Sequence, residues 1–253
     1  MEKTPYDKDH ASHYDASRNM PPEMQEAWLT TARKYLPHKD GARIIDIGSG
    51  TGRFAELFVK LPNSHITGVE PSEEMRKVAE TKKSSDRIRY LKGSAESLPI
   101  TNERFDLAWI SMVIHHVDNR TACASEAARV LNKGGFAIVR NTFSGRLEGI
   151  ELYEYFTGTA EIDNNRLPSV DEVRQPFEAA GLSFVALESV QQIFAVDFPA
   201  YIEKMRNRGT STLRLISDEE FQKGLSRLEE IQRSGKRSGP VTEFIDMLVF
   251  RKN

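Results

Sequence analysis

The chain has 253 residues, of which 39% are apolar and 28% are charged, so it can bury one substantial α/β core. Its 35 basic and 37 acidic residues give a net charge of −2, which provides no electrostatic surface for nucleic acid. The single cysteine excludes an internal disulfide, and the polar start lacks the apolar core of a signal peptide. No apolar run approaches the roughly 20 residues of a membrane helix. We therefore expect a cytosolic protein.

The first 36 residues are predicted to form a polar segment followed by one helix. Residues 1 to 20 fit either a frayed terminus or a segment that folds over a site. Pro21 and Pro22 then suit a helix start, apolar residues follow at helical spacing, and Pro37 ends the pattern.

A glycine-rich turn between a strand and a helix is the most informative feature of the sequence. Residues 44–47 are typical of a strand buried on both faces of a parallel sheet, and a helical pattern begins at Phe54. Between them lie Gly48, Gly50 and Gly52, whose missing side chains allow a ligand to lie against the backbone. This arrangement predicts a nucleotide-type site at the carboxyl end of the first strand.

The spacing of the glycines distinguishes between nucleotides. A dinucleotide fingerprint needs a third small residue where this chain has Arg53, so a pyrophosphate site is disfavoured. The segment from Asp46 to Gly52, which includes Ser49, instead resembles the first motif of the class I S-adenosylmethionine-dependent methyltransferases. The resemblance implies that this loop holds the methionine and ribose parts of S-adenosylmethionine.

A second strand is predicted over residues 66–70, ending at Glu70. Doubly wound folds place an acid there, roughly 20 residues after the glycine loop, to accept hydrogen bonds from a ribose diol. We therefore assign Glu70 to the ribose and place Pro71 beside it, the alternative being a solvated surface acid. Ser72 is expected to cap the helix that follows.

A third strand, 88–91, leads into a loop that resembles the family's GDAESLPF segment, which lies against the adenine. Ser94 stands where that family has an aspartate. Adenine recognition would then depend on the Ser94 hydroxyl, on backbone groups near Ala95, or on Glu96, and an ordinary surface turn remains the alternative.

The fourth strand, 105–110, is followed by Ser111 and a histidine pair, as in the family's FDLVVSSLVLHHV segment. Ligands lie outside the carboxyl ends of such strands, so these residues are expected near the methyl group of the cofactor. Adjacent histidines on a helical turn point about 100° apart, and they are not spaced as a zinc pair. We predict that His115 faces the site as the catalytic candidate, with His116 a substrate candidate and no metal.

A fifth strand, 136–142, follows an alanine-rich helix and a glycine stop at residues 132–135. The helix and the stop resemble the family's E…RVLKPGG signature. Arg140 and Asn141 leave this strand near the site and are substrate candidates, although a strand-end arginine is as often a surface charge.

The remainder is predicted to complete the sheet and to add a lid. Aromatic residues from Tyr153 to Phe156 suit core packing better than a substrate wall. Residues 184–190 and 242–250 resemble the antiparallel last strands of the family. Between them, residues 196–235 are predicted to form two helices, the second beginning with a Ser217/Glu220 capping box. A cluster of four basic residues within this insertion fits a solvated face, or else attraction of an anionic substrate.

The ordered motifs identify the chain as a class I methyltransferase that resembles the ubiquinone/menaquinone-biosynthesis and trans-aconitate enzymes. The resemblance implies a Rossmann-like, doubly wound α/β fold with a seven-stranded, mostly parallel sheet and an antiparallel last strand. It also implies that Tyr14 and Arg18, which match a "YD…R" segment, contact the carboxylate of the cofactor. We expect one domain over 1–253, with an N-terminal lid and helix (1–36), a cofactor-binding core (40–143) and an inserted helical lid (196–235).

The predicted reaction is methyl transfer to an N, O or C nucleophile of a small molecule, with alignment and exclusion of water as the main contributions of the protein. Three alternatives stay open: a nicotinamide-dependent oxidoreductase, an RNA or protein methyltransferase, and a cofactor-binding protein without catalysis. Neither the acceptor nor the oligomeric state can be deduced from the sequence.

Overall fold

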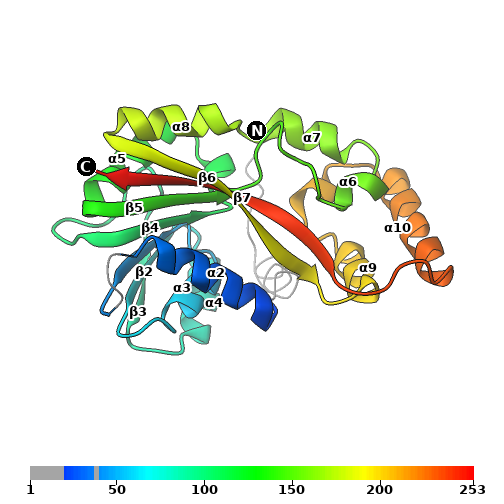
Figure 1. The fold of residues 1–253 in the computed structure, drawn as a ribbon, viewed down its shortest axis with the longest axis horizontal. Helices are drawn as coiled ribbons and strands as arrows, with labels where there is room; N and C mark the ends of the chain where they lie inside the picture. Colours follow the sequence, from blue (N-terminus) through cyan, green and yellow to red (C-terminus); the bar gives the residue numbers. More distant parts are fainter. Residues whose placement is uncertain (1–19, 37–39) are drawn as a thin grey trace.

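The structure, a computed structural model, describes residues 20–36 and 40–253 and contains one seven-stranded sheet in the order β3-β2-β1-β4-β5-β7-β6 (Figure 1). The strands are β1 (Arg43–Ile47), β2 (His65–Glu70), β3 (Ile88–Lys92), β4 (Phe105–Ser111), β5 (Leu131–Asn141), β6 (Leu182–Ala195) and β7 (Val241–Lys252). The pairs among β1 to β5 are parallel, while β7 runs antiparallel between β5 and β6. The predicted fold class is confirmed.

Helices cover both faces of the sheet, as expected for strands that are apolar on both sides (Figure 1). The helices of the core are α2 (Pro22–Lys34), α3 (Arg53–Phe58), α4 (Glu73–Lys82), α5 (Arg120–Val130) and α8 (Val170–Ala179). On one face, Trp28 of α2 and Phe54 of α3 pack around Trp109 of β4. On the other face, α5 and α8 form the second core through residues such as Ala124 and Val173.

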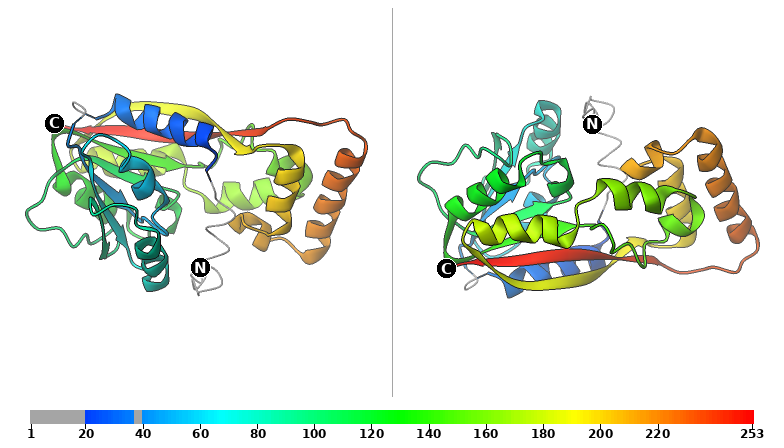
Figure 2. Two further views of the ribbon diagram at one scale, coloured as in Figure 1. Left: turned by 90° about the horizontal axis from the view of Figure 1, so that it is seen from below. Right: turned by 90° about the horizontal axis from the view of Figure 1, so that it is seen from above.

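A helical cap with its own core lies beyond the carboxyl edge of the sheet (Figures 1 and 2). The elements of the cap are α6 (Leu152–Tyr155), α7 (Thr159–Arg166), α9 (Phe198–Arg206), η2 (Ser211–Arg214) and α10 (Asp218–Arg233). The two helices predicted over 196–235 are present as α9 and α10. The ends of β6 and β7 run on into the cap, with Ala195 and Val241 in its core.

The cap also includes α6 and α7, which the sequence analysis did not assign. Only Thr159 and Asp163 of α7 are buried, so this helix lacks the apolar stripe by which helices are recognised in a sequence. The Asp163 carboxylate forms an ion pair with Arg166 and accepts hydrogen bonds from Tyr153 and Thr212. Buried polar contacts therefore hold α7 where apolar packing would be expected.

Two local predictions need correction. The glycine stop at 132–135 lies inside β5, which begins directly after α5. A Cβ at Gly135 would lie 3.0–3.2 Å from the backbone oxygens of Asn132, Asp106 and Phe105, so glycine is needed here for close backbone approach. At α10, Ser217 accepts from the Glu220 amide, but the Glu220 carboxylate pairs with Lys223, which leaves a simple N-cap among the described contacts.

Candidate active site

The three glycines of the loop after β1 all have positive φ, but they serve different purposes. A Cβ at Gly48 would lie 2.4 Å from the Val113 side chain, and one at Gly52 would lie 2.1 Å from the Tyr90 hydroxyl. Among the residues that the structure describes, no atom lies within 4 Å of a Cβ placed at Gly50. The expectation that all three leave space for a ligand is thus wrong for Gly48 and Gly52, whose space is taken by the protein. Gly50 alone faces open space.

Glu70 ties this loop to the end of β2. Its carboxylate accepts hydrogen bonds from the Gly50 amide at 3.0 Å and from the Ser72 amide at 2.9 Å, while Ser72 caps α4 as predicted. Burial raises the pKa of Glu70, and the two amide donors oppose that shift. A carboxylate has about four acceptor positions, so Glu70 can accept further hydrogen bonds beside Gly50.

The other loop residues contribute unequally. The buried Ser49 hydroxyl lies against Gly68, while Pro71 is exposed and its carbonyl accepts from Arg76. Ser94 belongs to a tight turn closed by a hydrogen bond from the Ser97 amide, and Ala95 is buried within the core. Glu96 accepts from the Asp118 amide at 3.2 Å. That contact commits one Glu96 oxygen to the loop before α5. Ser94 and the backbone near Ala95 are therefore better candidates than Glu96 for contact with an adenine ring.

Asp46, on β1 beneath the loop, is only 2% exposed. Burial raises the pKa of its carboxyl group to about 7, with nearby Glu70 adding to the shift and Arg53 opposing it. A buried carboxyl group with this pKa changes its charge near neutral pH.

This pKa predicts a pH-dependent stability. Between the ordinary pKa of an aspartate and about 7, the folded protein binds the proton while the unfolded chain does not, so the free energy of unfolding falls as pH rises. We expect the ligand-free protein to lose about 3 kcal/mol more than an Asp46→Asn variant between pH 5 and pH 8. Urea unfolding of both proteins at the two pH values measures this difference, and parallel pH profiles would contradict the assignment.

His115 and His116 lie on a short 3-10 turn, η1 (Ile114–His116), after β4. His116 is exposed, whereas His115 is partly buried and its Nδ1 lies 2.9 Å from Oδ1 of Asn141. Because the Asn141 amide nitrogen donates to the Thr142 carbonyl, its Oδ1 accepts and His115 Nδ1 carries the hydrogen. In neutral His115 the nitrogen able to accept a proton is therefore Nε2.

Arg140 and Asn141 are neighbours on β5 and so point to opposite faces of the sheet. Arg140 is buried, so the alternative that it is a surface charge is wrong. Its guanidinium lies 4.4 Å from the centre of the Trp28 ring and donates to Ser111 and Gln192. Arg140 and Ser111 thus join α2 to the sheet on one face, while Asn141 and His115 meet on the other.

Two residues of this region were not anticipated. Met112, between Ser111 and the histidine turn, has φ of 56°, in the region that side chains rarely adopt. The Met112 amide donates to the Arg140 carbonyl at 2.8 Å, and the next residue, Val113, covers Gly48. No sequence pattern indicates that Met112 has positive φ. The contact between the ends of β1 and β4 could therefore be found only in the structure.

The remaining predicted features do not contribute to the described site. Tyr14 and Arg18 fall outside the described residues. The basic cluster of the insertion engages acidic side chains and carbonyl oxygens, through Arg206 with Glu229, Arg208 with Asp218, and Lys204 with the Phe194 carbonyl. Within 20–36 and 40–253, no group of three or more His, Cys, Asp or Glu is suited to a metal ion. Over the same ranges, no helix combines the length and apolarity needed to cross a bilayer.

Comparison with protein-family models matches residues 45–139 to a methyltransferase domain. The chain is 33% identical over 135 residues to a ubiquinone/menaquinone biosynthesis C-methyltransferase of Paracoccus denitrificans, covering 51% of this chain and 54% of that protein. It is 25% identical over 222 residues to a demethylmenaquinone methyltransferase of Staphylococcus carnosus, covering 79% and 92% of the two chains. This chain therefore spans about half of the first relative and most of the second.

Solved structures share the fold over most of this chain. A putative methyltransferase from an antibiotic biosynthesis pathway of Anabaena variabilis aligns with a TM-score of 0.68 at 19% identity, over 89% of this chain and 96% of that one. A phosphoethanolamine N-methyltransferase of Haemonchus contortus, solved with S-adenosylhomocysteine, aligns with a TM-score of 0.63 at 18% identity, over 98% and 58%. At these identities the likeness concerns the fold.

Proposed function

Because the chain carries a methyltransferase domain of the class I, S-adenosylmethionine-dependent family, we propose that it methylates a nucleophile of a small molecule at the carboxyl edge of its sheet. The nucleophile is a nitrogen, oxygen or carbon atom. The observation that supports this location best is the contact of the Gly50 amide with Glu70, at 3.0 Å, where the chain leaves β1 and β2. It combines open backbone with a buried carboxylate, the two features that an adenosine group needs.

The residues around Gly50 fit S-adenosylmethionine, the cofactor of this family. Gly50 leaves room against the backbone, Glu70 has acceptor capacity for the two ribose hydroxyls, and Ser94 with the backbone near Ala95 would meet the base. Tyr14 and Arg18 are proposed for the carboxylate on the strength of the resemblance. When bound, the cofactor supplies an electrophilic methyl group on a sulfonium sulfur.

His115 is proposed to assist the reaction when the nucleophile starts as a protonated O–H or N–H group. Asn141 holds Nδ1–H, so Nε2 can take the proton that the nucleophile loses. The cap would exclude water from this edge, and residues 1–20 and the insertion (196–235) are the proposed lid.

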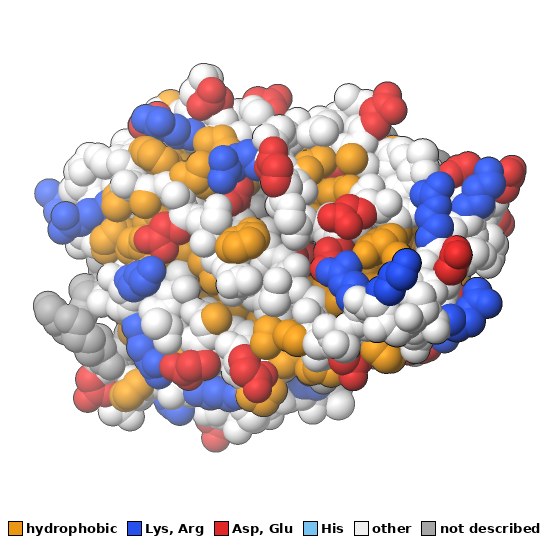
Figure 3. All heavy atoms as spheres, turned by 45° about the vertical axis from the view of Figure 1, so that its right-hand side comes forward, with side chains coloured by type: hydrophobic (Ala, Val, Ile, Leu, Met, Phe, Trp, Pro, Cys, Tyr) orange, Lys and Arg blue, Asp and Glu red, His pale blue; other side chains and the backbone are white. Residues whose placement is uncertain are grey.

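The charge distribution supports a small-molecule acceptor over a nucleic acid. Figure 3 shows basic and acidic side chains interspersed over one face of the molecule, without a continuous basic surface. A nicotinamide-dependent oxidoreductase is disfavoured by Arg53 in the third position of the dinucleotide fingerprint. We propose a cytoplasmic location, in keeping with the single cysteine, which is buried.

Direct binding and turnover measurements test the proposal. Calorimetry of the full chain should show S-adenosylhomocysteine binding and no NAD binding. Incubation with S-adenosylmethionine and panels of small nucleophiles should release S-adenosylhomocysteine. Binding of NAD in preference to S-adenosylhomocysteine would overturn the proposal, and cofactor binding without turnover on any acceptor would favour a binding protein.

Replacing Glu70 with alanine should weaken S-adenosylhomocysteine binding by at least about tenfold. The variant removes charge-assisted hydrogen bonds to the ribose, and hydrogen bonds to charged groups contribute about 1.5 to 3 kcal/mol each. It also leaves the Gly50 amide without its acceptor. Calorimetry measures the loss, and Glu73→Ala, an exposed acid in the first turn of α4, is the control. Unchanged affinity in a folded Glu70→Ala protein would remove Glu70 from the site.

A further inference from the structure

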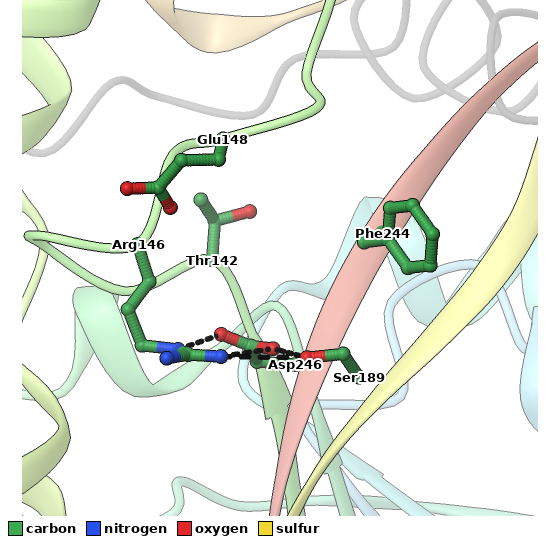
Figure 4. A pocket seen from close by; sticks show the side chains of 6 residues that line it. All are labelled: Thr142, Arg146, Glu148, Ser189, Phe244 and Asp246. Atoms are coloured by element: carbon green, nitrogen blue, oxygen red, sulfur yellow. Dashed lines mark hydrogen bonds and ion pairs between the residues drawn. The ribbon is translucent and has the colours of Figure 1, made fainter.

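A hollow of about 240 Å³ lies beside the proposed transfer site, where β5, β6 and β7 leave the sheet (Figure 4). Its lining consists of Thr142, Arg146, Glu148, Ser189, Phe244 and Asp246. Asn141, the partner of His115, is paired in register with Asp246 across β5 and β7. Paired residues point to the same face of a sheet, so the hollow begins one side chain away from His115 and Asn141.

The floor of the hollow is an ion pair whose charges cancel. Arg146 Nε donates to Asp246 at 2.5 Å, its Nη2 lies 3.3 Å from the other carboxylate oxygen, and Ser189 also donates to Asp246. Figure 4 shows these three side chains turned toward one another. Asp246 binds one edge of the Arg146 guanidinium, through Nε and Nη2, and balances its charge, so this arginine is less suited than an unpaired one to anchor a free carboxylate or phosphate.

The walls of the hollow carry the remaining charge and an aromatic ring. Glu148 is exposed, and among the described residues no side chain forms an ion pair or hydrogen bond with it, although Arg146 is near enough to interact with its charge. Because the charges of Arg146 and Asp246 cancel, the side chains that line the hollow carry a net charge of −1, which is that of Glu148. Across from it, Phe244 is 47% exposed, with its ring near Gly149 of the Glu148 loop, although it projects from the middle of the ribbon formed by β6 and β7. Figure 4 shows Glu148 and Phe244 on opposite sides of the hollow.

A carboxylate opposite an open aromatic face is an arrangement that binds organic cations, because the ring face and the carboxylate both attract positive charge. We propose that the methyl acceptor carries an ammonium or similar organic cation, which binds between Phe244 and Glu148. This inference rests on the proposed function and names the class of acceptor for that site.

The geometry also sets the length of the acceptor. Phe244 lies two residues before Asp246 on β7, and two residues of a strand span ~7 Å. A cation held at Phe244 would therefore place a nucleophile ~7 Å away beside Asn141 and His115. The acceptor is a short molecule with a cation at one end and the methylated atom at the other, and the hydroxyls of Thr142 and Ser189 lie along the hollow between these ends.

A matched pair of probes tests the charge requirement. The full chain, saturated with S-adenosylhomocysteine, is titrated by saturation-transfer NMR with choline and with 3,3-dimethylbutan-1-ol, which has the same shape with carbon in place of the charged nitrogen. We expect choline to bind at least tenfold more tightly than the neutral alcohol. Glu148→Gln and Phe244→Leu should each weaken choline binding by about threefold or more. Glu161→Gln, which changes an exposed acid of α7 outside the hollow, should leave it unchanged.

The outcomes separate this inference from the proposed function. S-adenosylhomocysteine affinity is measured in the same samples and should be equal in wild type, Glu148→Gln and Phe244→Leu. If S-adenosylhomocysteine binds but choline and the alcohol bind equally, the cation site is wrong and the methyltransferase proposal stands. The same conclusion follows if inorganic phosphate binds in preference to choline and Arg146→Gln removes the phosphate binding. If S-adenosylhomocysteine itself fails to bind, both fall. Thermal unfolding of each variant checks that the protein is folded.

Discussion

Gly50→Val is expected to abolish detectable S-adenosylhomocysteine binding while the protein stays folded. Gly50 has φ of 55°, and a Cβ there would project into space where no atom of residues 20–36 or 40–253 lies within 4 Å. A branched side chain would fill the volume in which we place the cofactor, and it would also disturb the amide that Glu70 holds. Calorimetry on the variant, with its fold checked by circular dichroism, measures the effect.

The strain of a valine at positive φ needs a control of its own, because such strain costs about 1 to 2 kcal/mol wherever it occurs. Gly41 provides it, since this glycine before β1 has φ of 77° and a Cβ there would meet no atom of the described part of the chain within 4 Å. Gly41→Val should lower stability to a similar degree and bind S-adenosylhomocysteine normally. If Gly50→Val binds as tightly as Gly41→Val, the cofactor lies elsewhere.

His115→Ala is expected to reduce kcat by about 10² to 10⁴ for an acceptor that loses a proton, the range typical of a positioned general base. S-adenosylhomocysteine affinity should be unchanged, because the contact that orients His115 is with Asn141 and not with the glycine loop. Added imidazole should restore part of the rate if the lost group acts on the proton. Single-turnover rates with saturating cofactor measure the chemical step directly.

His116→Ala is the matched control, since the two rings lie on one turn with centroids 4.1 Å apart but His116 is exposed. We expect this variant to keep nearly full activity. Full turnover by His115→Ala together with loss of turnover in His116→Ala would exchange the roles of the two residues. Equal activity of both variants would show that the acceptor does not need a base.

The sequence predicted the parts of the fold that depend on residues close to one another in the chain. Ile44, Ile45 and Ile47 are apolar and β-branched because β1 is covered on both faces, and Ser72 precedes an acidic turn because it caps α4. The position of Glu70 near the glycine loop was predicted for a related reason. In a parallel sheet the ends of neighbouring strands meet, so an acid after β2 must lie near the turn after β1.

The parts that the sequence did not predict depend on contacts between distant segments. Nothing near Gly52 indicates that Tyr90 fills the space beside it, and nothing near Arg140 indicates that Trp28 and Gln192 bury it. The hollow beside Asn141 joins residues about a hundred positions apart, such as Arg146 and Asp246. Helix α7 is held by the buried Asp163, so its polar sequence resembles that of a loop.

The cap is attached to the sheet by a two-stranded ribbon, in addition to the segments 142–151 and 167–169 that lead into α6 and out of α7. Pairing of β6 with β7 continues from Leu182 and Lys252 in the sheet to Ala195 and Val241 in the cap. Two-stranded ribbons take up more twist than wide sheets do, so substitutions along the ribbon can change its twist. Such a change would move Phe244, which lies on the ribbon, relative to Glu148, which lies on a separate loop, and would leave the Gly50 contact with Glu70 unchanged. If the proposed acceptor site is correct, acceptor choice can diversify through substitutions along the ribbon while the proposed cofactor site is preserved.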